Sequence, residues 1–409
     1  MNVVNERCAG LDIHKKTIAA CVIVPGRDGA PGKQVRTFGT MTDDLLALAD
    51  WLTSEDVTHV AMESTGVFWK APYNLLEADF TLLLVNPQHI KAVPGRKTDV
   101  KDCEWIADLL RHGLLRASFV PNREHRELRE LTRYRTSLVR ERADEVNRVQ
   151  KTLEGANVKL ASVATDILGK SGRQMLDALV AGSTDTAAMA QLAQRRMRSK
   201  IPQLERALAG RFGEHQRFLV TRQLAHIDFL DGEIATVSAA VEERLRPFQA
   251  ELDRLDSIPG IDRRNAEVIV AELGTDMSRF PTYRHLASWA RLCPGNNESA
   301  GKRKSGKTGR GNPWLRTALV QAAQAAGHTS TYLAAQLHRL TSRRGQKKAV
   351  VAVAHTILII AYHVLKNPAM YAELGKHYFD ERDRDAIKDR LVRRLKTLGF
   401  DVALTPQAA

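Results

Sequence analysis

The chain has 409 residues, of which 44% are hydrophobic and 26% are charged. This composition excludes a chain too polar to form a core, and the length allows two or three domains. Lysine and arginine exceed aspartate and glutamate, so that the formal net charge is +14. Such an excess of positive charge predicts a polyanionic partner, with nucleic acid as the first candidate.

The cysteine spacing and the apolar segments indicate the expected compartment. Cys8, Cys21, Cys103 and Cys293 are scattered and form no C-x-x-C pair, so we expect a reduced, zinc-free and cytoplasmic protein. The first residues lead directly into a strand-like pattern, which predicts no signal peptide. The most apolar run, residues 349–365, is short and contains two histidines. We interpret it as a buried core helix and expect no membrane partner.

The first region, residues 1–121, alternates strand and helix patterns. Its hydrophobic periodicity and turn residues predict strands at residues 8–13, 17–24, 34–40, 57–63 and 80–85, and helices at 43–52, 67–78 and 98–114. The order βββαβαβα predicts a mixed α/β sheet.

Four acidic residues in this region are candidates for a metal site. Asp99 and Asp102 are three residues apart and lie on the same face of the predicted helix. Two carboxylates that close repel each other unless a cation such as Mg²⁺ lies between them. Alone, this pair is most often a solvated helix face, while Asp12 and Glu63 can be a strand-end residue and an edge charge. Together, the four predict a Mg²⁺ site suited to phosphoryl transfer.

The second region, residues 122–250, has the pattern of a long helical arm. Between residues 123 and 148 there are eight arginines and six acids along a thin apolar seam. They form either a solvated helix with ion pairs at i,i+4 or an arm whose arginines contact phosphates. A second seam runs through Ile227, Leu230, Ile234, Val237, Val241 and Leu245. This seam must pack on another helix, within the chain or across a dimer, and a coiled-coil arm is the simplest interpretation.

The third region, residues 251–370, contains a turn and a basic loop. Residues 255–261 are similar to the second half of a helix-hairpin-helix, whose Pro259-Gly260 turn can bind a DNA phosphate or can simply join two helices. Six basic residues and no acid follow between residues 302 and 316, which favours phosphate binding; they are Lys302, Arg303, Lys304, Lys307, Arg310 and Arg316. Residues 301–308 match the Walker A pattern, but no strand precedes them and no helix follows at once, so we do not expect ATP binding.

Several short motifs together resemble a known family. In the first region they are Gly10-Leu11-Asp12-Ile13-His14-Lys15, Met62-Glu63-Ser64-Thr65-Gly66, Asn86-Pro87 and Lys97-Thr98-Asp99-Val100-Lys101-Asp102. In the third they are Ile258-Pro259-Gly260-Ile261, Leu292-Cys293-Pro294, Glu298-Ser299-Ala300-Gly301, Gly311-Asn312 and Lys347-Lys348-Ala349-Val350. These motifs resemble the DEDD transposases of bacterial insertion sequences, enzymes with an RNase H-like (RuvC-like) domain that are guided by a bridge RNA.

The resemblance implies roles for individual residues. It identifies Asp12, Glu63, Asp99 and Asp102 as the acidic tetrad and Ser299 as the nucleophile, with Ser305 as the alternative serine. It also implies an active site whose two halves come from different subunits, and therefore a homo-oligomer, a dimer or a tetramer. The expected partners are donor DNA, target DNA and the guide RNA.

We therefore expect an α/β domain followed by all-α regions: a RuvC-like mixed-sheet domain at 1–121, a helical coiled-coil arm at 122–250, a mostly helical transposase domain with the serine loop at 251–370, and a basic helix and tail at 371–409. The expected activity is DNA recombination through a phosphoserine intermediate. Two alternatives remain. A RuvC-like nuclease would activate water and need no serine, and a non-catalytic RNA- or DNA-binding protein would tolerate the loss of Asp99.

Overall fold

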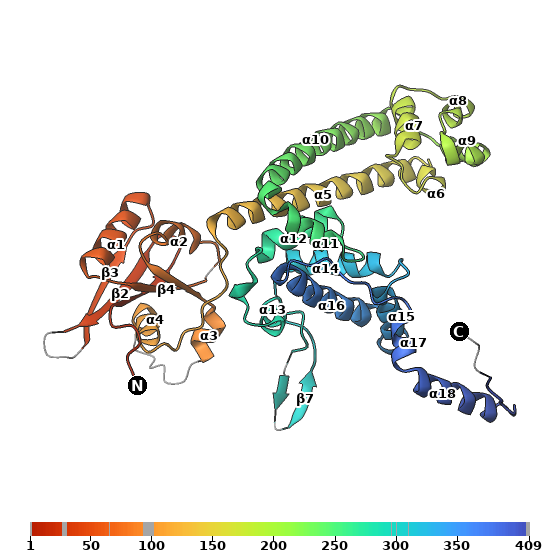
Figure 1. Ribbon diagram of the computed structural model, residues 1–409. Helices are drawn as coiled ribbons and strands as arrows, with labels where there is room; N and C mark the ends of the chain where they lie inside the picture. The colour runs from red at the N-terminus through yellow and green to blue at the C-terminus, as the bar shows by residue number, and fades with distance from the viewer. Residues whose placement is uncertain are drawn as a thin grey trace. The chain divides into compact units, whose positions relative to one another are not determined.

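The computed structural model describes residues 2–26, 31–64, 66–92, 102–295, 297–299, 301–309 and 311–405 (Figure 1). The chain divides into two compact units, Met1–Arg123 and Glu124–Ala409. The boundary between the two units falls close to residue 121, where the sequence predicts the end of the first domain. The two units are described separately.

The first unit is built on a five-stranded mixed sheet, as predicted. Its strands are β1 (Cys8–Ile13), β2 (Ile18–Pro25), β3 (Pro31–Phe38), β4 (His59–Glu63) and β5 (Thr81–Val85), in the order β3-β2-β1-β4-β5. β1, β2 and β3 pair antiparallel, whereas β1, β4 and β5 run parallel. Parallel pairing places the carboxyl ends of β1, β4 and β5 at the same edge of the sheet.

Helices cover both faces of this sheet. On one face, Leu11 and Ile13 pack with Leu48 and Leu52 of α1 (Thr42–Ser54) and with α2 (Lys70–Leu76). On the other face, Cys8 and other strand residues pack on α4 (Asp102–Arg111) and on Ile90 of α3 (Pro87–Ala92). Because side chains alternate along a strand, β1 contributes to both cores.

The structure corrects two expectations for this unit. The Asn86-Pro87 pair ends β5 as predicted, but Pro87 also begins α3, which the sequence analysis did not predict. Proline suits the first turn of a helix, where its missing N–H has no partner to lose. The described part of the helix expected at residues 98–114 is α4 (Asp102–Arg111), which ends at Arg111 and not at residue 114. Residues 98–101 lie outside the described residues.

The arm of the second unit is a pair of antiparallel helices, α5 (Arg123–Gly155) and α10 (Glu214–Leu245), which Figure 1 shows side by side. Arg244 contacts Glu127 at 2.7 Å, near the start of α5, and Gln223 contacts Thr152 at 3.4 Å, near its end. The seam from Ile227 to Leu245 is buried within the single chain. Of the two predicted partners for this seam, the structure therefore has the one within the chain.

Short helices form a small cap at the far end of the arm. They are α6 (Leu160–Val163), α7 (Lys170–Val180), α8 (Thr186–Gln191), η1 (Arg195–Lys200) and α9 (Ile201–Leu208). Their apolar side chains share one core with the ends of α5 and α10. The cap is joined to the arm by a short connection, because α9 ends at Leu208 and α10 begins at Glu214.

The rest of the second unit is mostly helical. Its elements are η2 (Arg246–Phe248), α11 (Gln249–Asp256), α12 (Arg263–Leu273), η3 (Met277–Arg279), α13 (Tyr283–Trp289), β6 (Asn297–Ser299), β7 (Lys302–Ser305), α14 (Pro313–Ala326), α15 (Tyr332–Arg344), α16 (Gln346–Lys366), α17 (Tyr378–Arg382) and α18 (Arg384–Thr397).

Helix α16 is the expected core helix. It packs against α14 and α15, and the hydroxyl group of its buried Tyr362 donates a hydrogen bond to the Phe280 carbonyl oxygen at 3.0 Å. Among the described residues it is the one helix long and apolar enough to cross a membrane, and 56% of its most apolar window is buried inside the protein. Its apolar character is therefore explained by packing.

Candidate active site

Asp12 and Glu63 lie on neighbouring parallel strands at the same edge of the sheet. The register pairs Leu11 with Met62, so the next residues along the two strands are Asp12 and Glu63. Parallel strands are about 4.8 Å apart, which places the two positions side by side. Asp12 is partly buried, with 21% of its side chain exposed, and its Oδ2 lies 3.2 Å from Nε2 of His14. The register therefore brings together two of the four acidic positions that the sequence groups into one site.

Helix α4 lies across the same face of the sheet. The Sγ atom of Cys8 is 3.6 Å from the carbonyl oxygen of Ala107. A Cβ atom at Gly10 would lie only 2.3 Å from the carbonyl oxygen of Cys103. The two contacts show the relative direction of strand and helix: residues nearer Asp12 on β1 contact residues nearer Asp102, the first residue of α4. Only glycine allows the helix backbone to approach this strand so closely.

Three of the four predicted carboxylates thus share one face and one end of the sheet. Asp102 is exposed in the first turn of α4, where the helix dipole favours a negative charge. Asp99 lies outside the described residues. Within the described part of the chain, no three histidine, cysteine, aspartate or glutamate side chains come together as a metal-binding group. The structure therefore shows a pair of adjacent strand positions and a nearby helix start, not a complete metal centre.

The two candidate serines lie at opposite ends of a β-hairpin. Strands β6 and β7 pair antiparallel, with Ser299 opposite Lys302 and Asn297 opposite Ser305. Ser299 therefore lies next to the turn, and Ser305 lies at the base of the hairpin. Lys302 and Lys307 are exposed, while Arg316 is half-buried on α14. Arg303 and Lys304 are on β7, and Arg310 lies outside the described residues.

The same hairpin explains why the Walker A match carries no phosphate-binding loop. Lys302–Ser305 is a strand, and the next helix, α14, does not begin until Pro313. A Walker A loop needs its helix directly after the pattern, because the N-terminus of that helix binds the phosphate.

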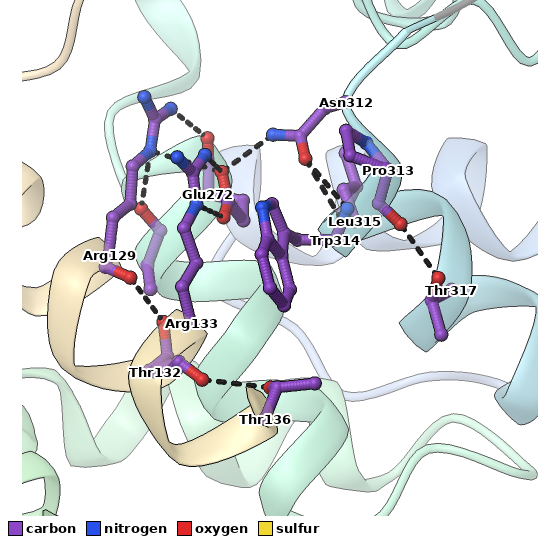
Figure 2. Close-up of polar contacts among 11 residues, drawn as sticks. Arg129, Thr132, Arg133, Thr136, Glu272, Asn312, Pro313, Trp314, Leu315 and Thr317 are labelled. Atoms are coloured by element: carbon purple, nitrogen blue, oxygen red, sulfur yellow. Dashed lines mark hydrogen bonds and ion pairs between the residues drawn. The ribbon is translucent and has the colours of Figure 1, made fainter. Parts of the chain in front are cut away.

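A buried carboxylate holds the segment that follows this hairpin. Glu272, at the end of α12, is completely buried, and Figure 2 shows its carboxylate among Arg129, Arg133 and Asn312. Arg133 donates to both carboxylate oxygens, at 2.7 and 2.8 Å, and Nε of Arg129 lies 3.2 Å from Oε2. Burial lowers the pKa of Arg129 to about 10, although the neighbouring Glu272 opposes this change. Arg129 therefore stays charged at neutral pH.

Asn312 connects this carboxylate to the start of α14. Its Nδ2 donates to Glu272 at 2.6 Å, while its Oδ1 accepts from the backbone N–H groups of Trp314 and Leu315, at 3.0 and 3.2 Å. This is a helix N-cap, which satisfies two N–H groups that lack partners within the helix. The end of the loop that contains both serines is therefore fixed to the helical core.

The Pro259-Gly260 turn packs as a joint between helices. Gly260 has φ +90°, and a Cβ atom there would lie 2.2 Å from the Ala322 carbonyl oxygen, so the turn is pressed against α14. The carboxylate of Asp262 accepts a hydrogen bond from the Asn265 N–H at 2.8 Å and caps α12. Because a negative charge already occupies this helix start, the contacts favour the structural interpretation over phosphate binding.

The roles of Glu272 and Asn312 were not predicted from the sequence. A signal for Glu272 was present, since it is a single acid at the end of the apolar run 268–273. An acid in such a run is buried and must be paired.

Comparisons with known proteins agree with the motifs. A DEDD transposase model of the IS110 type matches residues 9–158, and a model described as "Transposase IS116/IS110/IS902 family" matches residues 252–339. The chain is 25% identical over 373 residues to y4qE of Sinorhizobium fredii, a protein named as a transposase, covering 88% of this chain and 82% of the relative. It is also 25% identical over 300 residues to the insertion element IS110 43.6 kDa protein of Streptomyces coelicolor, covering 68% and 73%.

The two family models cover both regions in which the motifs occur, and together they account for more than half of the chain. The first contains the sheet edge with Asp12 and Glu63, and the second contains the serine hairpin, Glu272 and Asn312. This chain belongs to the IS110 family of DEDD transposases.

Proposed function

We propose that this transposase is a DNA recombinase, guided by a bridge RNA, that cuts and rejoins DNA with its acidic residues and Ser299. The observation that carries the proposal is the register of β1 and β4, which sets Asp12 beside Glu63 at the edge reached by the first turn of α4. Membership of the family supports DNA as the substrate, because transposases act on DNA.

The residues at this edge fit a hard divalent cation such as Mg²⁺. All the candidate ligands are carboxylates, and Mg²⁺ is commonly bound by one or two carboxylates together with substrate phosphates and water. Asp12, Glu63 and Asp102 would hold the ion, and Asp99, which lies outside the described residues, is proposed as the fourth ligand. When bound, it supplies charge stabilisation at the phosphoryl oxygens. The partial exposure of Asp12 leaves this edge open to DNA.

Ser299 is the proposed nucleophile because of its place in the hairpin. It lies beside the turn, where the chain can approach a DNA backbone, whereas Ser305 lies at the base. The serine oxygen attacks the phosphorus of a phosphodiester, an Oγ–P bond forms, and a P–O bond to one deoxyribose breaks. The serine proton ends on the departing deoxyribose oxygen. A hydroxyl group of another DNA end then reverses the exchange, so that rejoining needs no ATP.

The reacting groups in this proposal come from both structural units of the chain. The acidic residues belong to the first unit and the serine belongs to the second, and in the family we expect them to come from different subunits of a dimer or a tetramer. The basic residues of the serine loop, Lys302, Arg303, Lys304, Lys307, Arg310 and Arg316, are proposed to bind the phosphate backbone around the cut site.

Trapping the covalent intermediate tests the proposal. The protein is incubated with Mg²⁺, its guide RNA and a nicked target, digested, and searched by mass spectrometry for a nucleotide adduct. An adduct on Ser299 that disappears in Ser299→Ala supports the recombinase, and Ser305→Ala is the matched control that should keep it. Cleavage with free 5′-phosphates and no serine adduct would instead establish the water-activating nuclease.

Three further variants separate the parts of the proposal. Asp12→Asn and Glu63→Gln should each abolish cutting while the far-ultraviolet spectrum stays unchanged, because both side chains lie at the sheet edge outside the core. Neutralising the four basic residues between 302 and 307 should reduce the salt dependence of DNA binding, whose log–log slope we expect near −5 for about six phosphate contacts. An unchanged slope would exclude this loop from the DNA backbone.

A further inference from the structure

Three helices of the second unit enclose a small pocket that the proposed chemistry does not use. It has a volume of about 180 Å³ and is lined by α5, α12 and α14. Small-molecule sites usually measure about 300–1,000 Å³. A pocket this small holds one base or one phosphate of a longer molecule whose remainder stays outside.

The wall of this pocket is rich in arginine. Four arginines and a single carboxylate, Glu272, line it; the arginines are Arg133, Arg135, Arg140 and Arg264. Two of the four are already used within the protein, since Arg133 binds Glu272 and Arg135 contacts Glu267 at 2.7 Å. In the part of the chain that the structure describes, no acidic side chain forms an ion pair with Arg140 or Arg264, and both are exposed at the mouth. These two guanidinium groups can accept an external anion.

An aromatic ring lies beside these cations. The half-buried indole of Trp314 lines the pocket, and the Arg140 guanidinium carbon is 5.0 Å from its ring centroid. Figure 2 shows the Trp314 ring beside the Arg133 side chain. Arginine planes and indole rings are the surfaces on which unpaired nucleic-acid bases stack. Asn265 and Gln321 also line the pocket, and their amides suit the hydrogen-bonding edges of a base.

The walls are held rigidly, which favours a preformed site. Trp314 follows the N-cap Asn312, which is bonded to the buried Glu272, and the Thr132, Thr136 and Thr317 hydroxyl groups each donate to a backbone carbonyl of their own helix. A preformed pocket loses little side-chain entropy when it binds.

We propose that this pocket binds one nucleotide of a single-stranded polynucleotide, with its phosphate on Arg140 and Arg264 and its base against Trp314. A duplex cannot present a base in this way without unstacking it, so an unpaired segment is the partner. The inference rests on the proposed function in one respect only, namely that the partner is a nucleic acid. The pocket itself needs neither the carboxylates nor Ser299.

Oligonucleotide binding by the full-length protein tests this site. Fluorescently labelled single-stranded RNA and DNA of the same sequence are titrated by anisotropy at several salt concentrations. Arg140→Ala/Arg264→Ala should flatten the log–log salt slope by about 1.4, which corresponds to two lost phosphate contacts on a single strand. Trp314→Leu should weaken binding about 5-fold to 100-fold, the usual effect of losing one stacked base. Trp314→Phe, which keeps an aromatic ring, should lose less.

The chain offers a matched control for charge. Arg206 and Arg222 are exposed and have no acidic partner among the described residues, and Arg206→Ala/Arg222→Ala makes the same change in net charge. Equal slopes and affinities in the two double variants would overturn the proposal. Unchanged affinities for both single strands in Trp314→Leu would also overturn it, because the pocket requires an unpaired base against the indole ring.

The two single strands identify the source of the nucleotide. A larger loss on RNA assigns the pocket to RNA, and equal losses assign it to any single strand; both support the site. Ultraviolet crosslinking should place the oligonucleotide on the peptide that contains Trp314. Because these titrations measure binding and need no cutting of DNA, a failure of the catalytic proposal is distinguishable from a failure of this one.

Discussion

Replacing Glu272 by glutamine should strongly destabilise the second unit. The carboxylate is fully buried and contacts Arg133 at 2.7 and 2.8 Å and Arg129 at 3.2 Å. The neutral amide leaves two guanidinium groups without a counter-charge and points its own N–H₂ group at other donors. Removing one partner of a buried ion pair costs about 3–5 kcal/mol. For a unit of this size, that corresponds to a decrease of about 10 °C in the midpoint of thermal unfolding.

Calorimetry of the full chain at neutral pH measures this decrease. The control is Glu243→Gln, which removes an acid of the same type from an ion pair with Arg246 at 2.7 Å. Both of those side chains are largely exposed, at 62% and 73%, so the control should cost about 1 kcal/mol or less. Hydrogen exchange should also become faster in Glu272→Gln at the hairpin strands, because Asn312 loses its charged acceptor. Equal midpoints in the two variants would refute the reasoning that the Glu272 network stabilises the unit.

Three other predictions concern the arm, the core helix and the cysteines. Leu230→Asp/Ile234→Asp should cost several kcal/mol, measured by thermal unfolding, because both residues are buried within the chain; an unchanged melting curve would contradict the arm packing. Burial lowers the pKa of His355, so its contribution to stability is complete above about pH 6.5 and is lost as the pH falls below that value. The unfolding midpoint should therefore decrease more between pH 7 and pH 5 in the native protein than in His355→Leu, and equal decreases would show that His355 does not contribute. Burial raises the pKa of the Cys8 and Cys21 thiols to about 11 and about 12, whereas Cys293 is partly exposed. Maleimide labelling of the folded protein should therefore be lost in Cys293→Ser. Labelling that persists in this variant would show that a buried cysteine is reactive.

The sheet could be predicted because its strands are short apolar runs separated by turn residues. The parallel register of β1 and β4 could not be predicted, because β2, β3 and α1 separate the two strands along the chain and the order of the elements does not fix which strands pair. Helix α3 could not be predicted in the same way. Its first residue, Pro87, is a signal both for the end of a strand and for the first turn of a helix, and the local pattern does not decide between them.

The apolar seam of the arm was predicted, but the pairing of its helix with α5 was not. The spacing of Ile227, Leu230 and Ile234 shows that one side of the helix must be covered, yet it does not say by which helix. The contacts of Arg244 with Glu127 and of Arg142 with Asp231 fix the antiparallel pairing with α5. Such pairs join residues far apart in the sequence, and they become visible only when the chain is folded.

The charge of the chain shows most clearly what the sequence leaves undecided. The sequence offered two interpretations of the arginines of α5: ion pairs along one solvated helix, or contacts with phosphates. In the structure, Arg133 and Arg135 bind carboxylates of α12, and Arg142 binds Asp231 of α10. These arginines are used to attach α5 to its neighbouring helices, and they add little to the field that an external polyanion meets.

Arg140 differs from those arginines although its spacing along α5 gives no sign of it. It lies on the exposed mouth of the pocket, over the Trp314 ring, and no acidic side chain of the described residues pairs with it. The net charge of +14 therefore does not tell how many cations at a given surface are free to bind a polyanion, or where those cations lie. The useful quantity is the set of cations left after the carboxylates have been paired, and two members of that set, Arg140 and Arg264, lie at a pocket with an aromatic wall.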